Sequence, residues 1–298
     1  MPKIYIEGSY GTVGSVVKEY LKPLESSGDI QIITLPENDR KNIELQKEAA
    51  RKADLVVCCL PSSNSKDFIE IVKRENPEAK ILDTSHIFRC DNGWIYGLPE
   101  ITGESLIRGA KYIANPGCFA TCCILVNKPL ENLLPKQTLM SYCGFVGTSA
   151  RGNKPLKYSL PMLIGFGREH KHIPEIVKHS GILTNLTTTV GDWDRGMLVQ
   201  AFIPLAFDTV YETLSNFYAK TNVKITRIGK DSPLNIDPRE CVYTNNVHIF
   251  LTPTHNCTSV SVVVDNLGKG AAGAAMQNIK LMMNIREYGY KDGRVEHV

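Results

Sequence analysis

Apolar residues in the first part of the chain cluster in short strand-like segments, at residues 3–7, 30–34, 53–60 and 80–83, and the third is a nearly continuous apolar run. Such runs are typical of strands buried on both faces of a parallel sheet. Residues 41–52 and 65–75, and the apolar stripe that begins at Val16, have the spacing of amphipathic helices. Strands and helices therefore alternate, and the pattern predicts an α/β fold with a Rossmann-type parallel-sheet domain.

The pattern changes after residue 117. Strand-like runs separated by turns follow at residues 139–145, 184–190, 196–204, 247–251 and 258–264. A segment at residues 155–164 and a helix at residues 209–220 lie between them. This arrangement predicts an α+β domain with a mostly antiparallel sheet. Helices that pack on one face of such a sheet leave its other face open to a partner, so we expect a homodimer or homotetramer.

These patterns predict two domains. We expect residues 1–117 to form a dinucleotide-binding domain, completed by a C-terminal helix at residues 269–298. Residues 118–268 would form the catalytic, substrate-binding and dimerisation domain. With 298 residues the chain is long enough for two cores of ordinary size.

Composition narrows the class of protein. Hydrophobic residues make up 43% of the chain and charged residues 22%, with a net charge of +3, as in an ordinary folded enzyme. The sequence has no basic stripe of the kind that nucleic-acid-binding proteins show. No apolar run approaches the roughly 18 residues that a membrane-spanning helix needs. Nine cysteines without paired C-x-x-C spacing indicate reduced thiols and a cytoplasmic location, without disulfides or structural zinc.

The sequence Asn-Pro-Gly-Cys at residues 115–118 ends a strand-like run and opens an apolar, helix-length segment. Cys118 then falls at the first turn of a helix, where the positive end of the helix dipole favours a thiolate. We therefore predict that Cys118 is a nucleophile. The alternative is a small buried hydrophobe, which is how we interpret Cys122 and Cys123.

A glycine-rich turn follows the first predicted strand and precedes a helix, the order that places a pyrophosphate over a helix N-terminus. The glycine spacing is G-x-x-G-x-x-G and not G-x-G-x-x-G, and a turn of this kind also serves plain packing. We expect the cofactor to contact the turn at Gly8, Tyr10, Gly11, Thr12, Val13 and Gly14.

The second predicted strand ends at Thr34 without an acidic residue at its tip, and Arg40 and Lys41 follow. An acid there would bind a ribose hydroxyl, whereas two cations favour a 2′-phosphate, so we expect NADP (NADPH). The alternative is that these cations only open a solvated helix. Parallel sheets bind ligands beyond their carboxyl strand ends, where the third strand leads into Leu60, Pro61 and Ser62.

Polar residues in three later segments are candidates for catalysis and substrate binding. Ser85 and Arg89 follow the fourth strand, and a guanidinium pairs well with a carboxylate or phosphate, although an ordinary salt bridge is an equal alternative. His170 and His172 are candidate proton carriers for a thiolate, since without a third ligand cluster they do not indicate zinc. Asn278 would meet a nicotinamide carboxamide or else serve packing.

These stretches together resemble the N-acetyl-γ-glutamyl-phosphate reductase family, in its shorter variant. The matching segments are the glycine turn, residues 96–100, 115–121, 170–175, 269–273 and 277–278. The resemblance implies NADPH-dependent reduction of N-acetylglutamyl 5-phosphate to N-acetylglutamate 5-semialdehyde through a Cys118 thioester, in arginine biosynthesis. We expect Asn115 and Glu175 to contact the small-molecule acyl phosphate. The chain departs from the family pattern at Cys122 and at residues 146–154.

Two other functions fit the same residues. One is another acyl-phosphate dehydrogenase of this architecture, such as an aspartate-semialdehyde enzyme. The other is a non-catalytic NADP-binding redox sensor in which Cys118 is oxidised, although no paired resolving cysteine accompanies it.

Overall fold

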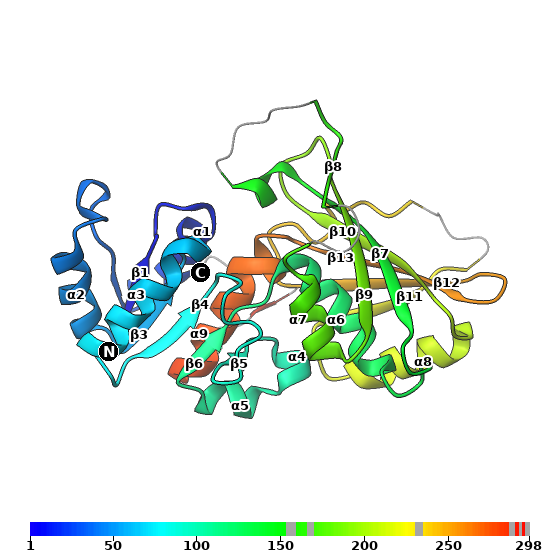
Figure 1. The fold of residues 1–298 in the computed structure, drawn as a ribbon, viewed down its shortest axis with the longest axis horizontal. Helices are drawn as coiled ribbons and strands as arrows, with labels where there is room; N and C mark the ends of the chain where they lie inside the picture. The colour runs from blue at the N-terminus through cyan, green and yellow to red at the C-terminus, as the bar shows by residue number, and fades with distance from the viewer. Residues whose placement is uncertain (153–158, 166–169, 230–234, 286–289, 292–293, 296–298) are drawn as a thin grey trace. The chain divides into compact units, whose positions relative to one another are not determined.

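The computed structural model describes residues 1–152, 159–165, 170–229, 235–285, 290–291 and 294–295, and its chain divides into two compact units (Figure 1). Unit 1 comprises Met1–Pro116 and Ala271–Val298, and unit 2 comprises Gly117–Gly270. Residues 155–158 of the predicted segment 155–164 lie outside the described residues. The same holds for residues 153–154, which belong to the stretch where the chain departs from the family pattern. None of the described helices is long and apolar enough to cross a membrane.

Unit 1 contains an all-parallel sheet in the order β2-β1-β3-β4-β6-β5. Its strands are β1 (Lys3–Glu7), β2 (Gln31–Ile33), β3 (Leu55–Cys58), β4 (Lys80–Asp83), β5 (Ile95–Tyr96) and β6 (Tyr112–Ala114). The helices of unit 1 are α1 (Thr12–Ser26), α2 (Ile43–Lys52), α3 (Ser62–Glu75), α4 (Pro99–Thr102), α5 (Glu104–Gly109) and α9 (Gly273–Met283), with a 3₁₀ turn η1 (Glu37–Asp39).

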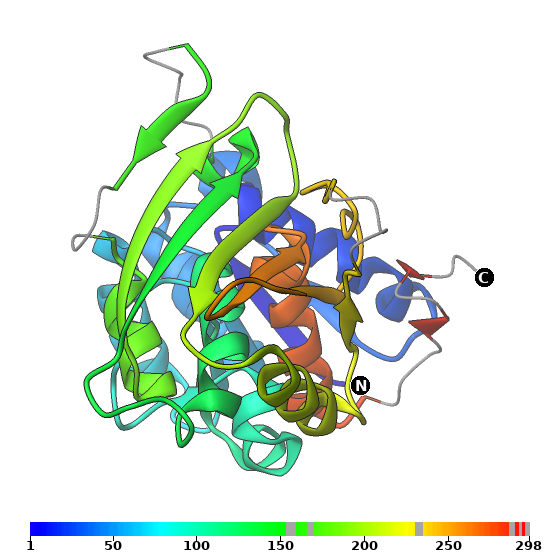
Figure 2. The same cartoon turned by 90° about the vertical axis from the view of Figure 1, so that its right-hand side faces the viewer.

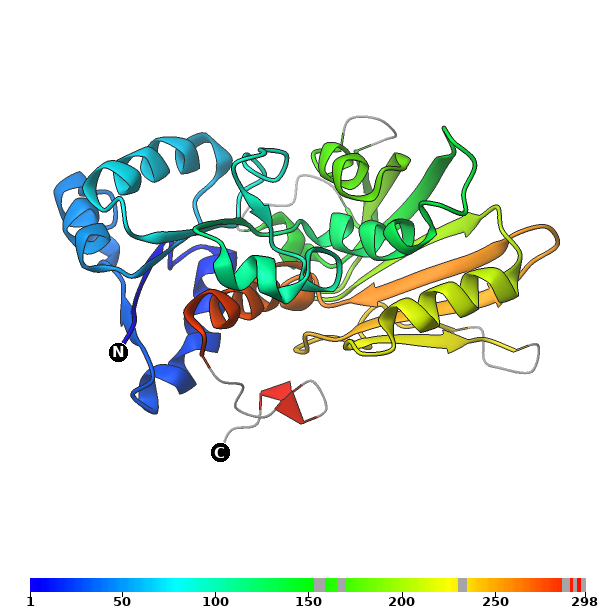
Figure 3. The same ribbon diagram turned by 90° about the horizontal axis from the view of Figure 1, so that it is seen from below.

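Helices cover both faces of this sheet, which is why its strands are apolar throughout. Val17 of α1, Ile107 of α5 and Ile279 of α9 pack on one face in a single core cluster. Helices α2 and α3 lie on the other face (Figure 3). Ala50 of α2 and Ile69 of α3 belong to the second core cluster. The predicted Rossmann-type α/β fold is confirmed.

Helix α9 packs in unit 1 as expected, but the prediction that it continues to residue 298 was wrong. It ends at Met283, because Asn284 has a left-handed backbone with φ 51°. Asparagine tolerates this conformation at a helix end. Two short paired strands, β14 (Tyr290–Lys291) and β15 (Arg294–Val295), follow.

Unit 2 contains a mixed sheet in the order β11-β12-β13-β10-β7-β9-β8. The β7/β9 and β11/β12 pairs are parallel and the other pairs antiparallel, in agreement with the predicted mostly antiparallel sheet. Figure 2 shows the long strands β7 and β9 side by side in green. The strands are β7 (Leu139–Val146), β8 (Met162–Ile164), β9 (Leu183–Val190), β10 (Met197–Ile203), β11 (Val223–Arg227), β12 (Val247–Pro253) and β13 (Thr258–Val264).

Three helices pack on one face of this sheet: α6 (Cys118–Leu130), α7 (Ile173–Ser180) and α8 (Phe207–Tyr218). β7 alternates strictly between exposed and buried positions, so its inward side chains meet α6 and its outward ones do not. No described helix covers the outward face, which carries exposed Leu139, Phe145, Leu183 and Phe202. A 3₁₀ turn η2 (Thr148–Arg151) follows β7, and a π-helical turn η4 (Gly268–Ala272) follows β13.

Candidate functional site

Helix α6 begins at Cys118, as the sequence predicts. Gly117 caps the helix with an extended backbone, and its carbonyl accepts the Thr121 N–H at 2.8 Å, which closes the first turn. Cys118 is half-buried, whereas burial raises the pKa of Cys122 and Cys123 well above the usual thiol range. Of these three thiols in α6, only Cys118 combines partial exposure with the positive end of the helix.

The two candidate histidines lie together, with ring centroids 4.7 Å apart. The His172 backbone N–H donates to His170 Nδ1 at 3.2 Å, so the proton of a neutral His170 is on Nε2. Burial, with a smaller contribution from the Lys171 ammonium, lowers the pKa of His170 to about 4. His170 is therefore a neutral N–H donor at pH 7, and His172 is buried beside it.

Glu175 connects the histidine segment to the nucleophile helix. It lies in the first turn of α7 and is 1% exposed. One carboxylate oxygen accepts the Gly117 N–H at 3.2 Å, and the other lies 3.9 Å from His172 Nε2. Two segments far apart in the sequence are thus joined at the residue before Cys118, which spacing alone did not reveal.

The glycine turn of unit 1 is shaped by close backbone approach. Gly8 has φ +78°, and a Cβ there would lie 2.8 Å from the Cys59 carbonyl oxygen. A Cβ on Gly14 would lie 2.2 Å from the Gly8 carbonyl oxygen. The Gly11 N–H donates to the same oxygen at 3.0 Å, so the turn closes on itself and α1 begins at Thr12. Val13 is the second residue of α1, and Tyr10 is 42% exposed at the tip of the turn.

The residues proposed for the phosphate of the cofactor lie beyond β2. Thr34 follows the last residue of that strand. Arg40 and Lys41 are exposed and lie in the turn between η1 and α2, so they precede the helix and do not lie within it. Arg40 Nη1 donates to Glu37 Oε1 at 2.9 Å.

The segment after β3 lies where the sequence places it, with Leu60 directly before Pro61, the N-cap of α3. Ser62 opens the helix, three residues earlier than predicted, and its hydroxyl lies 2.6 Å from His86 Nδ1. This hydrogen bond joins the start of α3 to the loop that follows β4.

Ser85 and Arg89 are both buried in unit 1. Ser85 donates to Asp83 Oδ2 at 2.6 Å, and Ser65 donates to the other Asp83 oxygen at the same distance. Arg89 donates from Nε to the Asn115 carbonyl at 2.8 Å and from Nη2 to the Thr84 carbonyl at 3.1 Å. Asp83, at the end of β4, fixes the positions of the Ser65 and Ser85 hydroxyls, and the sequence did not predict this role. A buried strand that ends in a carboxylate was the available signal.

Asn115 and Asn278 are hydrogen-bonded to each other and buried. Asn278 Nδ2 donates to Asn115 Oδ1 at 3.1 Å and to the Gly97 carbonyl at 2.9 Å, and Asn115 Nδ2 donates to the Ala271 carbonyl at 3.0 Å. Asn278 Oδ1 is buried without a hydrogen-bond partner among the described residues. A buried amide oxygen of this kind requires a donor.

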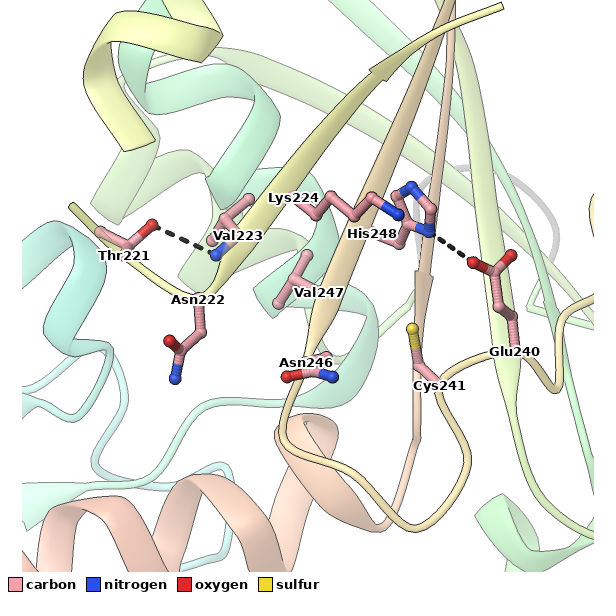
Figure 4. A pocket seen from close by; sticks show the side chains of 9 residues that line it. All are labelled: Thr221, Asn222, Val223, Lys224, Glu240, Cys241, Asn246, Val247 and His248. Atoms are coloured by element: carbon pink, nitrogen blue, oxygen red, sulfur yellow. Dashed lines mark hydrogen bonds and ion pairs between the residues drawn. The ribbon is translucent and has the colours of Figure 1, made fainter. Parts of the chain in front are cut away.

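A pocket of about 360 Å³ in unit 2 is a second candidate site (Figure 4). Its His248 has both ring nitrogens engaged, Nδ1 with Glu240 at 2.5 Å and Nε2 with the Thr226 hydroxyl at 2.7 Å. Burial raises the pKa of its Cys241 to about 12. The pocket therefore lacks an activated nucleophile and a histidine nitrogen ready for proton transfer. Across the described ranges, no three His, Cys, Asp or Glu residues form a group that could hold a metal.

Two family models match the chain, one in each unit. "Semialdehyde dehydrogenase, NAD binding domain" matches residues 4–108, and "Semialdehyde dehydrogenase, dimerisation domain" matches residues 118–266. A curated protein from Burkholderia lata, named N-acetyl-gamma-glutamyl-phosphate reductase, is 31% identical over 96% of this chain and 98% of its own. The chain belongs to the N-acetyl-γ-glutamyl-phosphate reductase family. The resemblance drawn from the motifs is confirmed, and so is the prediction of an oxidoreductase with a nicotinamide dinucleotide cofactor.

Other members of this reductase family give the same result. A protein of that name from Rhizobium etli is 30% identical over 95% of this chain and 99% of its own. Among solved structures, aspartate semialdehyde dehydrogenase II from Vibrio cholerae superposes with a TM-score of 0.72 at 17% identity, covering 96% of this chain and 99% of its own. The Francisella tularensis enzyme also gives 0.72, at 14% identity and 95% and 100% coverage. These two likenesses concern the fold.

Proposed function

We propose that the protein reduces N-acetylglutamyl 5-phosphate to N-acetylglutamate 5-semialdehyde, with release of phosphate, using NADPH, as a step of arginine biosynthesis. The observation that carries the proposal is the placement of Cys118 at the start of α6, next to a Gly117 N–H bonded to Glu175 of the histidine segment. The name shared by the curated relatives supports the choice of substrate.

The glycine turn fits a dinucleotide. Side chains are excluded at Gly8 and Gly14 by the contacts described above, which leaves backbone and the N-terminus of α1 to face a pyrophosphate. Asn278 Oδ1 supplies the acceptor that a nicotinamide carboxamide N–H needs. When bound, the reduced cofactor supplies the hydride.

The choice of NADPH over NADH rests on Arg40 and Lys41. The Arg40–Glu37 ion pair is exposed on both sides, and pairs of this kind contribute little to stability. Arg40 can therefore give up its ion pair with Glu37 and bind the 2′-phosphate at a small cost in free energy. Lys41, the next residue, adds a second positive charge.

The chemistry of the acyl group proceeds on Cys118. Its sulfur attacks the acyl-phosphate carbon, the bond from carbon to the phosphate oxygen breaks, and the acyl group remains as a thioester. Backbone N–H groups at the start of α6 stabilise the oxyanion, an effect of about 3 kcal/mol in enzymes where it has been measured. After hydride addition the C–S bond breaks, which releases the semialdehyde and restores the thiolate.

We assign the proton transfers to His172. Its Nε2 lies 3.9 Å from the Glu175 carboxylate, which stabilises the imidazolium that forms when the Cys118 thiol or the thiohemiacetal oxygen loses its proton. His170, kept neutral by burial, donates its Nε2–H to the substrate carbonyl or phosphate. Ser85, Arg89, Asn115 and Glu175 remain candidate substrate contacts.

Oligomerisation would use the outward face of the unit 2 sheet. Leu139, Phe145, Leu183 and Phe202 are exposed there, and exposed apolar patches mark interaction sites. We infer a homodimer that pairs this face with its copy. The match to a dimerisation domain over residues 118–266 supports this arrangement.

The test is NADPH oxidation by the purified protein with N-acetylglutamyl phosphate and, separately, aspartyl phosphate. We expect turnover with the first substrate, and a loss of at least about a thousandfold in kcat for Cys118→Ser, because the nucleophile is removed. Cys143→Ser, at an exposed thiol of β7, is the matched control and should keep its activity. Preference for aspartyl phosphate would move the protein to the aspartate-semialdehyde reaction. NADPH binding without turnover would favour a redox sensor.

A further inference from the structure

Phe119, the residue after Cys118, contacts both imidazoles of the site. Its ring centroid lies 5.5 Å from that of His170, with the planes at 82°, and 6.0 Å from that of His172, at 49°. The edge-on geometry with His170 is favourable for aromatic rings. Phe119 is 4% exposed. Phe119 and the buried His172 thus form a ring cluster with the half-buried His170 within unit 2.

The sheet backbone determines where this ring lies. Gly144 occupies an inward position of β7, paired with Val199 of β10 and Thr188 of β9. A Cβ on Gly144 would lie 2.3 Å from Phe119 Cε1 and 2.7 Å from Cδ1. The phenyl ring therefore fills the space that any other side chain at residue 144 would need. Its position is set by the central strands of a hydrogen-bonded sheet.

We propose that Phe119, packed against Gly144, is a positioning residue that keeps His170 and His172 in a fixed position relative to the Cys118 sulfur. The proposal rests on the function proposed above. Phe119 and Cys118 are consecutive residues of α6, so any shift of the helix moves the sulfur and the supporting ring together. The imidazoles, in contact with that ring, follow the nucleophile.

The ring also controls the environment of His170. Removing it would admit water to a histidine whose neutral form depends on burial. Among the described residues, the charged groups beside the ring cluster are Lys171, which acts on His170, and Glu175, which lies next to His172. Neither belongs to α6. A change in the His170 titration after a substitution at Phe119 would therefore report desolvation and not a lost charge.

Phe119→Leu separates positioning from plain packing, with Phe207→Leu as its matched control. Phe207 is a buried phenylalanine of α8 in the same unit, and it contacts Tyr211 and Arg227 and not the histidines. Both substitutions remove a buried ring, so both should lower Tm. Only Phe119→Leu should change the site.

The readouts are histidine titration by NMR in the ligand-free protein, and steady-state kinetics. We expect Phe119→Leu to raise the pKa of His170 from about 4 toward 6.5 and to lower kcat about ten- to a hundredfold, with KM within about threefold. Phe207→Leu should leave all three unchanged. If Phe119→Leu lowers Tm alone and keeps the wild-type titration and kcat, the positioning role is excluded.

Gly144→Ala provides a second test that leaves Phe119 in place. The added methyl displaces the ring, so the titration and kcat should change in the same direction as in Phe119→Leu. Gly109→Ala, where a Cβ meets nothing within 4 Å, is its control. Because the titration needs no substrate, it decides this proposal even if wild-type protein fails to reduce N-acetylglutamyl phosphate. That failure would count against the proposed function alone.

Discussion

At the scale of single residues, one carboxylate organises the candidate site. Glu175 binds the N–H of the residue before the nucleophile and lies beside the imidazole that we assign to proton transfer. It is almost fully buried, and a buried carboxylate requires such partners. Glu175 therefore links the start of α6 to the histidine segment.

His170 predicts a pH dependence of stability. Its pKa is about 4 in the folded protein against 6.5 for an ordinary histidine, so the unfolded chain takes up its proton first as pH falls. Stability from this group is complete above pH 6.5 and is lost as pH falls toward 4. Urea unfolding of wild type and His170→Gln at several pH values measures it.

The variant should show a smaller loss of stability than wild type over that interval. His255→Gln, at an exposed residue between β12 and β13, should follow wild type. Equal slopes for wild type and His170→Gln would show that His170 does not carry a depressed pKa.

At the scale of elements, the turn η4 and the start of α6 are packed backbone against backbone. A Cβ on Gly270 would lie 2.7 Å from Cys118 Cβ and 3.1 Å from the Asp265 carbonyl oxygen. Asp265 cannot easily move, because its carboxylate binds Arg195 at 2.7 Å and accepts the Leu267 N–H at 2.9 Å. The strain of a larger residue at 270 would therefore fall on Cys118.

Gly270→Ala should lower kcat at least about tenfold, because small displacements of reacting groups are costly. It should also change the rate at which iodoacetamide alkylates Cys118 at pH 7. Gly109→Ala again serves as the control, since that position has open space. If Gly270→Ala has the same alkylation rate and the same kcat as the wild type, η4 adjusts without moving the nucleophile.

The elements near Cys118 were predictable because their signals are local. Pro116 and Gly117 mark the turn between β6 and α6, and a strand-like run at residues 139–145 marks β7. The parallel pairing of β7 with β9 was not predictable in the same way, because it depends on contacts between distant segments. Phe119 and Gly144 were missed as site-forming residues for that reason. Glu175 was predicted as a substrate contact, but its hydrogen bond to the Gly117 N–H was not. Their roles appear only when three segments meet.

At the scale of the whole molecule, the units differ in how their sheets are covered. Unit 1 has helices on both faces of its sheet, whereas no described helix lies on the outward face of the unit 2 sheet. The α+β pattern of strands and helices after residue 117 predicted a sheet with helices on one face only. It did not reveal that the outward residues include two phenylalanines on neighbouring strands.

Phe202→Glu should convert the proposed dimer to a monomer, because a carboxylate on a buried apolar interface is strongly unfavourable. Sedimentation velocity of wild type and variant measures the change. Leu106→Glu, at an exposed leucine of α5 in unit 1, should leave the dimer intact. A wild-type sedimentation coefficient for Phe202→Glu would place any subunit contact elsewhere.

Unit 1 is built from two segments that are far apart in the sequence, which has a consequence for folding during translation. Ala275, Ile279 and Met282 of α9 belong to the same core as Ile4 and Leu21 near the N-terminus. A ribosome makes those two groups about 250 residues apart, at roughly 5 to 20 residues per second. The contiguous Gly117–Gly270 unit can fold while translation continues, but the dinucleotide-binding core has to wait for the last helix. Nascent chains stalled before α9 would thus expose apolar surface and become chaperone clients.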